Sequence, residues 1–121
     1  MKKHKAKILR VIDGDTFVAD VVMFTLRLVF DFCITVHKVV TLRLYGVDTP
    51  EIRTKNKKEK KRGLLVKSFV QSLLEEREVD VIIHKKDNFG RWLAEVFIGE
   101  QSLGILLFLK GYAEATKTRR K

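Results

Sequence analysis

The residues best suited to chemistry are three carboxylates and two arginines, each in a short motif. They are Asp15 in IDGDT, Arg43 in RLYG, Asp48 and Glu51 in VDTPE, and Arg91 in FGRWLA. Oxygen ligands without a histidine or cysteine cluster suit a hard cation, Ca²⁺ or Mg²⁺, better than zinc. Arginine forks can grip phosphate oxygens in two places. A cation, two arginines and a spare carboxylate are the groups that phosphodiester hydrolysis needs.

The only proline of the chain, Pro50, lies inside this acidic segment. The residue before a proline is driven into an extended conformation, so Thr49 should hold Asp48 and Glu51 in defined directions. Taken alone, DTPE and IDGDT are each more typical of a turn than of a metal site. The chemical interpretation rests on the occurrence of all the parts in one short chain.

Apolar alternation predicts strands in the first half of the chain. AKILRVI should form a strand that ends at the turn DGD, and VVTLRLYG a strand that leads into VDTPE. Between them the even positions of 22–36 are all apolar, and this period of two indicates half-buried strands. We expect an extended hairpin insertion between Asp15 and Arg43, with its corner near Asp31 or around His37–Lys38.

The second half combines helices with a further hairpin. Residues 53–62, RTKNKKEKKR, have no apolar member and are expected to be a solvated loop, where Lys55, Lys57 and Lys58 steer phosphate. GLLVKSFVQSLLEER predicts an amphipathic helix. EVDVIIHKK and RWLAEVFI predict strands joined by the turn DNFG, and SLGILLFLKG predicts a helix with Gly111 at its C-cap. The order predicts an α+β, mainly β, fold: a five-stranded Greek-key OB-fold barrel with two or three helices.

Length and composition exclude several classes of protein. The 121 residues are expected to form one domain, 1–121, with 114–121 as a flexible basic tail. A hydrophobic content of 45% excludes a disordered chain, and no apolar run approaches a membrane span, so no membrane partner is expected. The single cysteine, Cys33, excludes an internal disulfide. A net charge of +10 favours a polyanionic partner such as nucleic acid.

These motifs, in this order, resemble the staphylococcal (micrococcal, or thermonuclease) nuclease family over about residues 7–113. The resemblance is carried by VIDGDT, RLYGVDTPE, a basic loop, a helix, DNFGR-x-LAEVF and LLFLKGYA. It implies an OB-fold barrel and Ca²⁺-dependent cleavage of DNA and RNA that leaves 3′-phosphorylated products. It further implies specific roles for six residues. Asp15 and Asp48 would bind Ca²⁺ through carboxylates and Thr49 through its main-chain oxygen, Arg43 and Arg91 would bind the scissile phosphate, and Glu51 would be the general base or water-positioning residue.

The chain departs from the family in three places. The segment before Arg43 is longer than in the compact secreted nucleases, and its exposed edge could pair with a second chain. Asn88 and Phe89 are candidate substrate contacts, but they replace a lysine and a tyrosine that hold a terminal phosphate in the best-known members. The family's C-terminal tyrosines are replaced by TKTRRK, in which Lys117 and Arg119 offer nonspecific phosphate contacts.

We therefore predict a Ca²⁺-dependent, sequence-nonspecific endonuclease that acts on DNA and/or RNA, as a monomer or as a homodimer through the extended hairpin. The alternative is a catalytically silent OB-fold module that binds single-stranded nucleic acid or a protein partner. No apolar leader follows the basic N-terminal residues, so a cytoplasmic protein is expected, or a secreted one whose leader has been removed.

Overall fold

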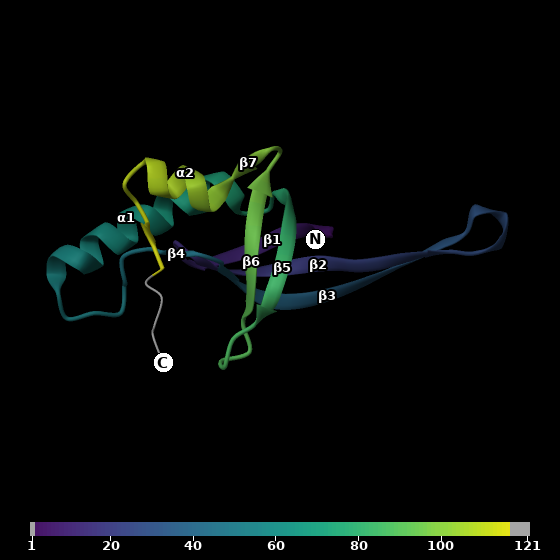
Figure 1. Cartoon of the computed structure of the whole chain (residues 1–121), viewed down its shortest axis with the longest axis horizontal. Helices are drawn as coiled ribbons and strands as arrows, with labels where there is room; N and C mark the ends of the chain where they lie inside the picture. The colour runs from purple at the N-terminus through teal and green to yellow at the C-terminus, as the bar shows by residue number, and fades with distance from the viewer. Residues whose placement is uncertain (1, 117–121) are drawn as a thin grey trace.

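The computed structural model describes residues 2–116 and contains a closed ring of five strands (Figure 1). The strands are β1 Lys3–Asp13, β2 Thr16–Arg27, β3 Cys33–Leu44, β5 Glu78–Lys86 and β6 Trp92–Ile98. They lie in the order β3-β2-β1-β5-β6, and a parallel pairing of β3 with β6 closes the ring. The short strand β7 Gln101–Ser102 extends the sheet beyond β6, and β4 Val47–Asp48 pairs with β8 Glu114–Ala115. The predicted OB-like α+β fold is confirmed.

Two α-helices pack against this barrel, α1 Lys57–Leu74 and α2 Leu103–Leu109. Helix α1 buries Gly63, Val66, Val70 and Leu74, a spacing of three or four residues that places them on one face. The largest fully buried side chains come from both strands and helices: Phe17, Ile8, Leu42, Leu74, Leu103 and Leu107. The core thereby fixes the part of α1 from Gly63 to Leu74 against the barrel. No helix among residues 2–116 is long and apolar enough to cross a membrane.

Helix α1 begins earlier than the apolar pattern predicts, so the loop expected over residues 53–62 is wrong from Lys57 onward. Asn56 is the N-cap, and its side chain accepts hydrogen bonds from the backbone nitrogens of Lys58 at 3.0 Å and Glu59 at 3.1 Å. A carboxylate in the first turn also favours the helix dipole. The cap starts the helix here without any apolar periodicity in its first turns.

Strands β2 and β3 continue beyond the barrel as a two-stranded extension (Figure 1), which we call the arm, residues 24–36. A turn of 3₁₀-helix at Val29–Asp31 forms its corner, so the corner lies at the first of the two predicted positions. His37–Lys38 is inside β3. The expectation of half-buried strands is wrong here, because the arm lies beyond the barrel and helices and no other described layer covers its apolar side chains.

The C-terminal segment pairs with the rest of the fold as far as Thr116. Glu114 and Ala115 form β8 against β4, and the backbone nitrogen of Thr116 donates to the Gly46 carbonyl at 2.9 Å. These contacts join residues 114–116 to the segment 46–48, and the flexible tail expected over 114–121 stays a prediction. The predicted phosphate contacts Lys117 and Arg119 lie outside the described residues.

Candidate functional site

One end of the barrel carries an open cavity of about 1120 Å³. The turn between β1 and β2, the end of β3, the segment 48–53, the start of α1 and residues 111–114 contribute to its walls. The predicted site residues that line it are Asp15, Arg43, Asp48, Thr49, Glu51, Arg91 and Lys58. Lys55, Lys57, Asn88 and Phe89 do not line it, and Phe89 is exposed beside it at the β5–β6 turn.

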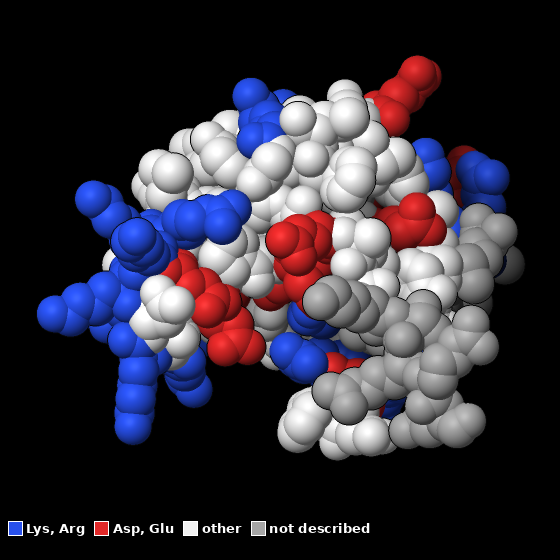
Figure 2. Space-filling view, turned by 60° about the vertical axis from the view of Figure 1, so that its left-hand side comes forward, with Lys and Arg blue, Asp and Glu red and all other residues white. Residues whose placement is uncertain are grey.

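Charge is separated across this face of the molecule. Figure 2 shows carboxylates gathered in its middle, with Lys and Arg side chains concentrated to one side. The seven basic residues of 53–62 are all exposed, and Arg53, Lys58 and Arg62 also line the cavity. A polyanion would meet this basic rim before it reached the acidic interior of the cavity.

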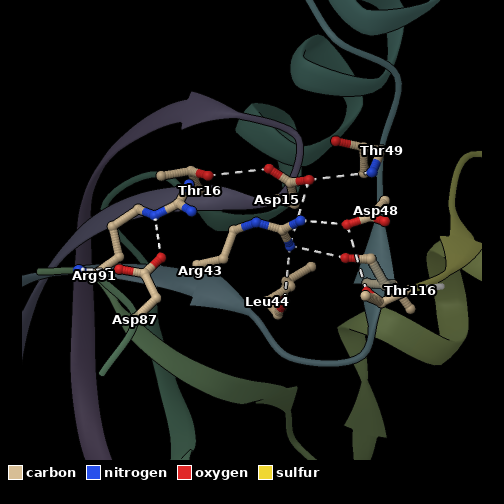
Figure 3. A network of polar contacts seen from close by, with 10 residues as sticks. Asp15, Thr16, Arg43, Leu44, Asp48, Thr49, Asp87, Arg91 and Thr116 are labelled. Carbon is tan, nitrogen blue, oxygen red and sulfur yellow. Dashed lines mark hydrogen bonds and ion pairs between the residues drawn. The ribbon is translucent and has the colours of Figure 1, made fainter. Parts of the chain in front are cut away.

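Arg43 is the centre of the polar network in the cavity (Figure 3). One terminal nitrogen donates to the carbonyls of Leu44 and Val47, both at 2.8 Å, and lies 3.5 Å from Asp15 Oδ2. The other terminal nitrogen donates to Asp48 Oδ1. With a side chain only 17% exposed, the guanidinium is anchored from two directions and forms ion pairs with both carboxylates.

Asp15 is nearly buried and uses both of its oxygens. Oδ1 accepts a hydrogen bond from the Thr16 hydroxyl at 3.0 Å, and Oδ2 accepts one from the Thr49 backbone nitrogen at 3.1 Å. These bonds tie the β1–β2 turn to the segment that precedes Pro50. Gly14 allows the approach, because a Cβ atom there would lie 2.7 Å from Val66 Cγ1 and 3.2 Å from Thr49 Oγ1.

Arg91 is held on the opposite side of the cavity by Asp87. The Arg91 Nε donates to Asp87 Oδ2 at 2.7 Å, and the backbone nitrogens of Phe89 and Arg91 donate to Oδ1 at 2.8 and 2.9 Å. Burial opposes ionisation of Asp87, but these hydrogen bonds and the Arg91 charge outweigh it and lower the pKa of Asp87 from 3.8. Asp87 therefore stays charged and orients the Arg91 fork.

Helix α1 supports Glu51 from behind. The Glu51 backbone nitrogen donates to Glu59 Oε2 at 3.2 Å. A Cβ atom on Gly63 would lie 2.8 Å from the Pro50 carbonyl oxygen and 3.0 Å from that of Glu51, so only glycine allows this packing. The exposed Glu51 side chain thus extends from a backbone that is fixed on one side by a helix and on the other by Pro50.

Asp15, Asp48 and Thr49 are the residues that could hold a cation. Two carboxylates and a main-chain carbonyl form a donor set of oxygens alone, which fits a hard cation that keeps water or substrate oxygens in its other positions. Residues 2–116 contain no cluster of three or more His, Cys, Asp or Glu side chains placed to hold a metal. The protein would therefore supply only part of the coordination, as in an open site.

Several contributors were missed by the sequence analysis. They are Thr16, Glu59, Gly63, Asp87 and Tyr112, of which Tyr112 lines the cavity wall and packs edge-on against Phe69. The spacing of Asn56 and Glu59 is a helix-start signal that could have been used. A glycine within an apolar helical pattern likewise indicates close packing. No local motif predicts that Tyr112 lines the cavity, since its position depends on the course of the chain after α2.

Comparison with known proteins gives a consistent result. Residues 41–121 match the family described as "Staphylococcal nuclease homologue". The chain is 32% identical over 111 residues to the thermonuclease of Staphylococcus hyicus, which covers 90% of this chain and 57% of that protein. It is 31% identical over 110 residues to the thermonuclease of Staphylococcus intermedius, which covers 89% and 57%. An uncharacterized protein of Methanocaldococcus jannaschii is 28% identical over 119 residues, which covers 82% and 51%. The chain thus spans little more than half the length of each relative.

Proposed function

Because the chain belongs to the staphylococcal nuclease family, we propose that it is a nuclease that hydrolyses phosphodiester bonds of DNA and/or RNA without sequence specificity. The observation that carries this proposal is the convergence of Arg43, Arg91 and three carboxylates on one open cavity. The exposed basic rim and the net charge of +10 supply a nonspecific attraction for the substrate backbone.

The two arginines would bind the scissile phosphate in different ways. Arg91 uses Nε for Asp87, and among the described residues its terminal nitrogens have no hydrogen-bond partner, so they are available for phosphate oxygens. Arg43 already donates to two carbonyls and a carboxylate, so it would offer a fixed positive charge close to the phosphate. Both groups are oriented before substrate arrives and would stabilise charge that develops on the phosphate.

Glu51 would orient or deprotonate the attacking water. Its side chain is exposed on the cavity lining while its backbone is fixed, which suits a group that must meet a water molecule in one direction. The water oxygen would bond to phosphorus as the bond to the 5′ oxygen breaks, the water proton would pass to the Glu51 carboxylate, and the leaving 5′ oxygen would take a proton from solvent. The products would be a 3′-phosphate and a 5′-hydroxyl.

Ca²⁺ is the cofactor that we propose, held by the carboxylates of Asp15 and Asp48 and by the main-chain oxygen of Thr49. When bound, it would neutralise phosphate charge and supply Lewis-acid stabilisation. The support is the all-oxygen donor set together with the family resemblance. The two carboxylates now share the Arg43 guanidinium, so they already lie near a common point.

Digestion of plasmid DNA and of RNA by the purified chain, with Ca²⁺, with Mg²⁺ or with chelator, tests the proposal. We expect cleavage with Ca²⁺ that chelator abolishes, and end-group analysis should give 3′-phosphates. An Arg91→Ala variant serves as the control for contaminating nucleases. The absence of chelator-sensitive cleavage would refute the proposal, and salt-dependent retention of an oligonucleotide without cleavage would support the silent binding module instead.

A further inference from the structure

The arm, residues 24–36, presents a continuous apolar face. Residues opposite each other in an antiparallel pair point to the same side, so Phe24 lies beside Val36 and Leu26 beside Ile34. Phe24, Leu26 and Ile34 are 46%, 49% and 43% exposed. At the corner of the arm, Leu28, Val29, Phe30 and Phe32 are exposed as well.

The opposite face of the arm is polar. Thr25 pairs with Thr35, and their hydroxyl oxygens lie 3.3 Å apart. Arg27 forms an ion pair with Asp31 at 2.9 Å next to the corner. Water satisfies this face, so only the apolar face lacks a suitable environment.

The exposed apolar area matches what one partner of a stable complex buries. Phe24, Phe30 and Phe32 are 46%, 99% and 62% exposed. Since an aromatic side chain covers roughly 150–250 Å², these three residues alone present roughly 300–500 Å². The exposed aliphatic side chains Leu26, Leu28, Val29 and Ile34 bring the apolar area towards the ~800 Å² per partner of a standard interface, above the ~300–600 Å² of the largest patch on a typical monomer.

The arm is also unsupported within its own chain. Strand β1 pairs with β2 only as far as Val21, and β6 pairs with β3 only from Leu42. A two-stranded hairpin is marginally stable in water by itself. At the corner, the fully exposed Phe30 has a φ of 57°, in the left-handed region that bulky residues avoid. Exposed apolar side chains on an unsupported, strained hairpin indicate an external contact.

We propose that the occupant is a second copy of this chain, and that two arms pack apolar face to apolar face in a symmetric dimer. The face is apolar and contains no charged side chain, so the same face of a second copy can pack against it around a twofold axis. Arg43 lies nine residues along β3 from Ile34, about 30 Å of strand. Repulsion between two chains of charge +10 is screened over about 8 Å at physiological salt, and the apolar contact must outweigh what remains of it.

A lipid surface fits the arm less well. Insertion of the corner would bury the Arg27–Asp31 ion pair, which is costly in hydrocarbon. If the arm lay flat on an anionic membrane, basic residues should flank its apolar face. Residues 24–36 carry one arginine and one aspartate and so have no net charge. The dimer therefore agrees better with the charge of the arm.

Sedimentation of the full chain from micromolar to hundreds of micromolar concentration tests the proposal. The unmodified chain should reach twice its monomer mass of 14.1 kDa. Leu26→Lys should weaken the dimer by roughly 100-fold or more, because it places two unpaired charges in the apolar contact. Thr25→Lys is the matched control: it adds the same charge at the next residue, on the polar face, and should leave the dimer intact.

Circular dichroism establishes that each variant is folded, and Ile34→Lys replaces Leu26→Lys if that variant is not. An unmodified chain that stays monomeric throughout the range would overturn the proposal, as would a dimer that survives both lysine substitutions on the apolar face. Monomers that sediment with anionic vesicles would also overturn it, in favour of a lipid surface. None of these readouts depends on nuclease activity, so the dimer and the proposed function can fail separately.

Discussion

Strands β2 and β3 carry opposite surfaces at their two ends. At one end Thr16 pairs with Arg43, and polar side chains converge on the cavity. At the other end Arg27 pairs with Cys33, and apolar side chains are exposed on the arm. In the cavity every buried charge has a partner within the chain, whereas the apolar side chains of the arm lack partners among residues 2–116. The buried polar groups of the first surface are therefore held by contacts within the chain, and the second surface indicates a missing neighbour.

Replacement of Arg43 by alanine should have the largest effect at the cavity end. Loss of one preorganised charge-stabilising donor raises the barrier by about 3 kcal/mol, or more than 100-fold in rate. Asp15, only 8% exposed, also loses its charged partner, so the free energy of unfolding should fall by about 2 kcal/mol. Cleavage rates and denaturant unfolding measure the two effects.

Arg91→Ala is the comparison for that variant. It should raise the activation barrier by a similar amount but lower the free energy of unfolding much less, because Arg91 is bound through Asp87 at the cavity rim. Rates close to those of the unmodified chain in either variant would show that the site is misplaced. Equal losses of stability would contradict the difference in anchoring between the two arginines.

Glu51→Gln should lower turnover by about 100-fold or more, since general bases contribute that much. The amide keeps the size of the side chain but cannot accept a proton, while Asp15 and Asp48 remain to bind Ca²⁺. Turnover at saturating Ca²⁺ and calorimetric titration of the cation separate these two properties. Glu114→Gln, at another exposed acid of the cavity lining, is the matched control and should retain activity. An equal loss in both variants would remove the special role of Glu51.

The sequence predicts the cavity end well, because its motifs are local. DGDT forms the turn between β1 and β2, VDTPE runs from strand β4 to Pro50 and Glu51, and the longer strands before these motifs follow from apolar alternation. The sequence does not predict how Asp15 reaches the Thr49 nitrogen, since that contact joins segments 34 residues apart. The interaction of Asp87 with Arg91 was missed for a different reason, because DNFG predicts a turn whatever the aspartate binds.

The two strands of the arm were predicted, but the solvent exposure of its apolar side chains was not. Alternation over residues 22–36 identifies two strands and one apolar face, but the pattern does not reveal what covers that face. Strand alternation of this kind normally indicates contact with the core of the same chain, and here the strands extend beyond that core. The early start of α1 was missed because its first turns contain no apolar residue, and the N-cap Asn56 starts the helix instead.

Asp87→Asn should have a smaller, pH-dependent effect. Because the pKa of Asp87 is lower in the fold than its ordinary value of 3.8, the charged form stabilises the fold above that pH. The contribution is lost as the pH falls through the lower folded value. We expect Asp87→Asn to be about 1 kcal/mol less stable at neutral pH. The two chains should become equal in strongly acidic solution, as measured by denaturant unfolding. A difference that did not change with pH would show that the Asp87 charge contributes nothing.

The smallest effect should come from the arm, where Leu26→Lys should leave the cleavage rate of a short oligonucleotide unchanged per chain. Leu26 pairs with Ile34, about 30 Å of strand from Arg43, and effects at such separations are usually independent. A short substrate occupies one cavity, so loss of the dimer should not change its cleavage. The measurement is the rate per chain at concentrations where the unmodified protein is dimeric and the variant monomeric. A large loss of rate would show that the two ends of β2 and β3 are coupled, and that the cavity requires the arm contact to reach its active arrangement.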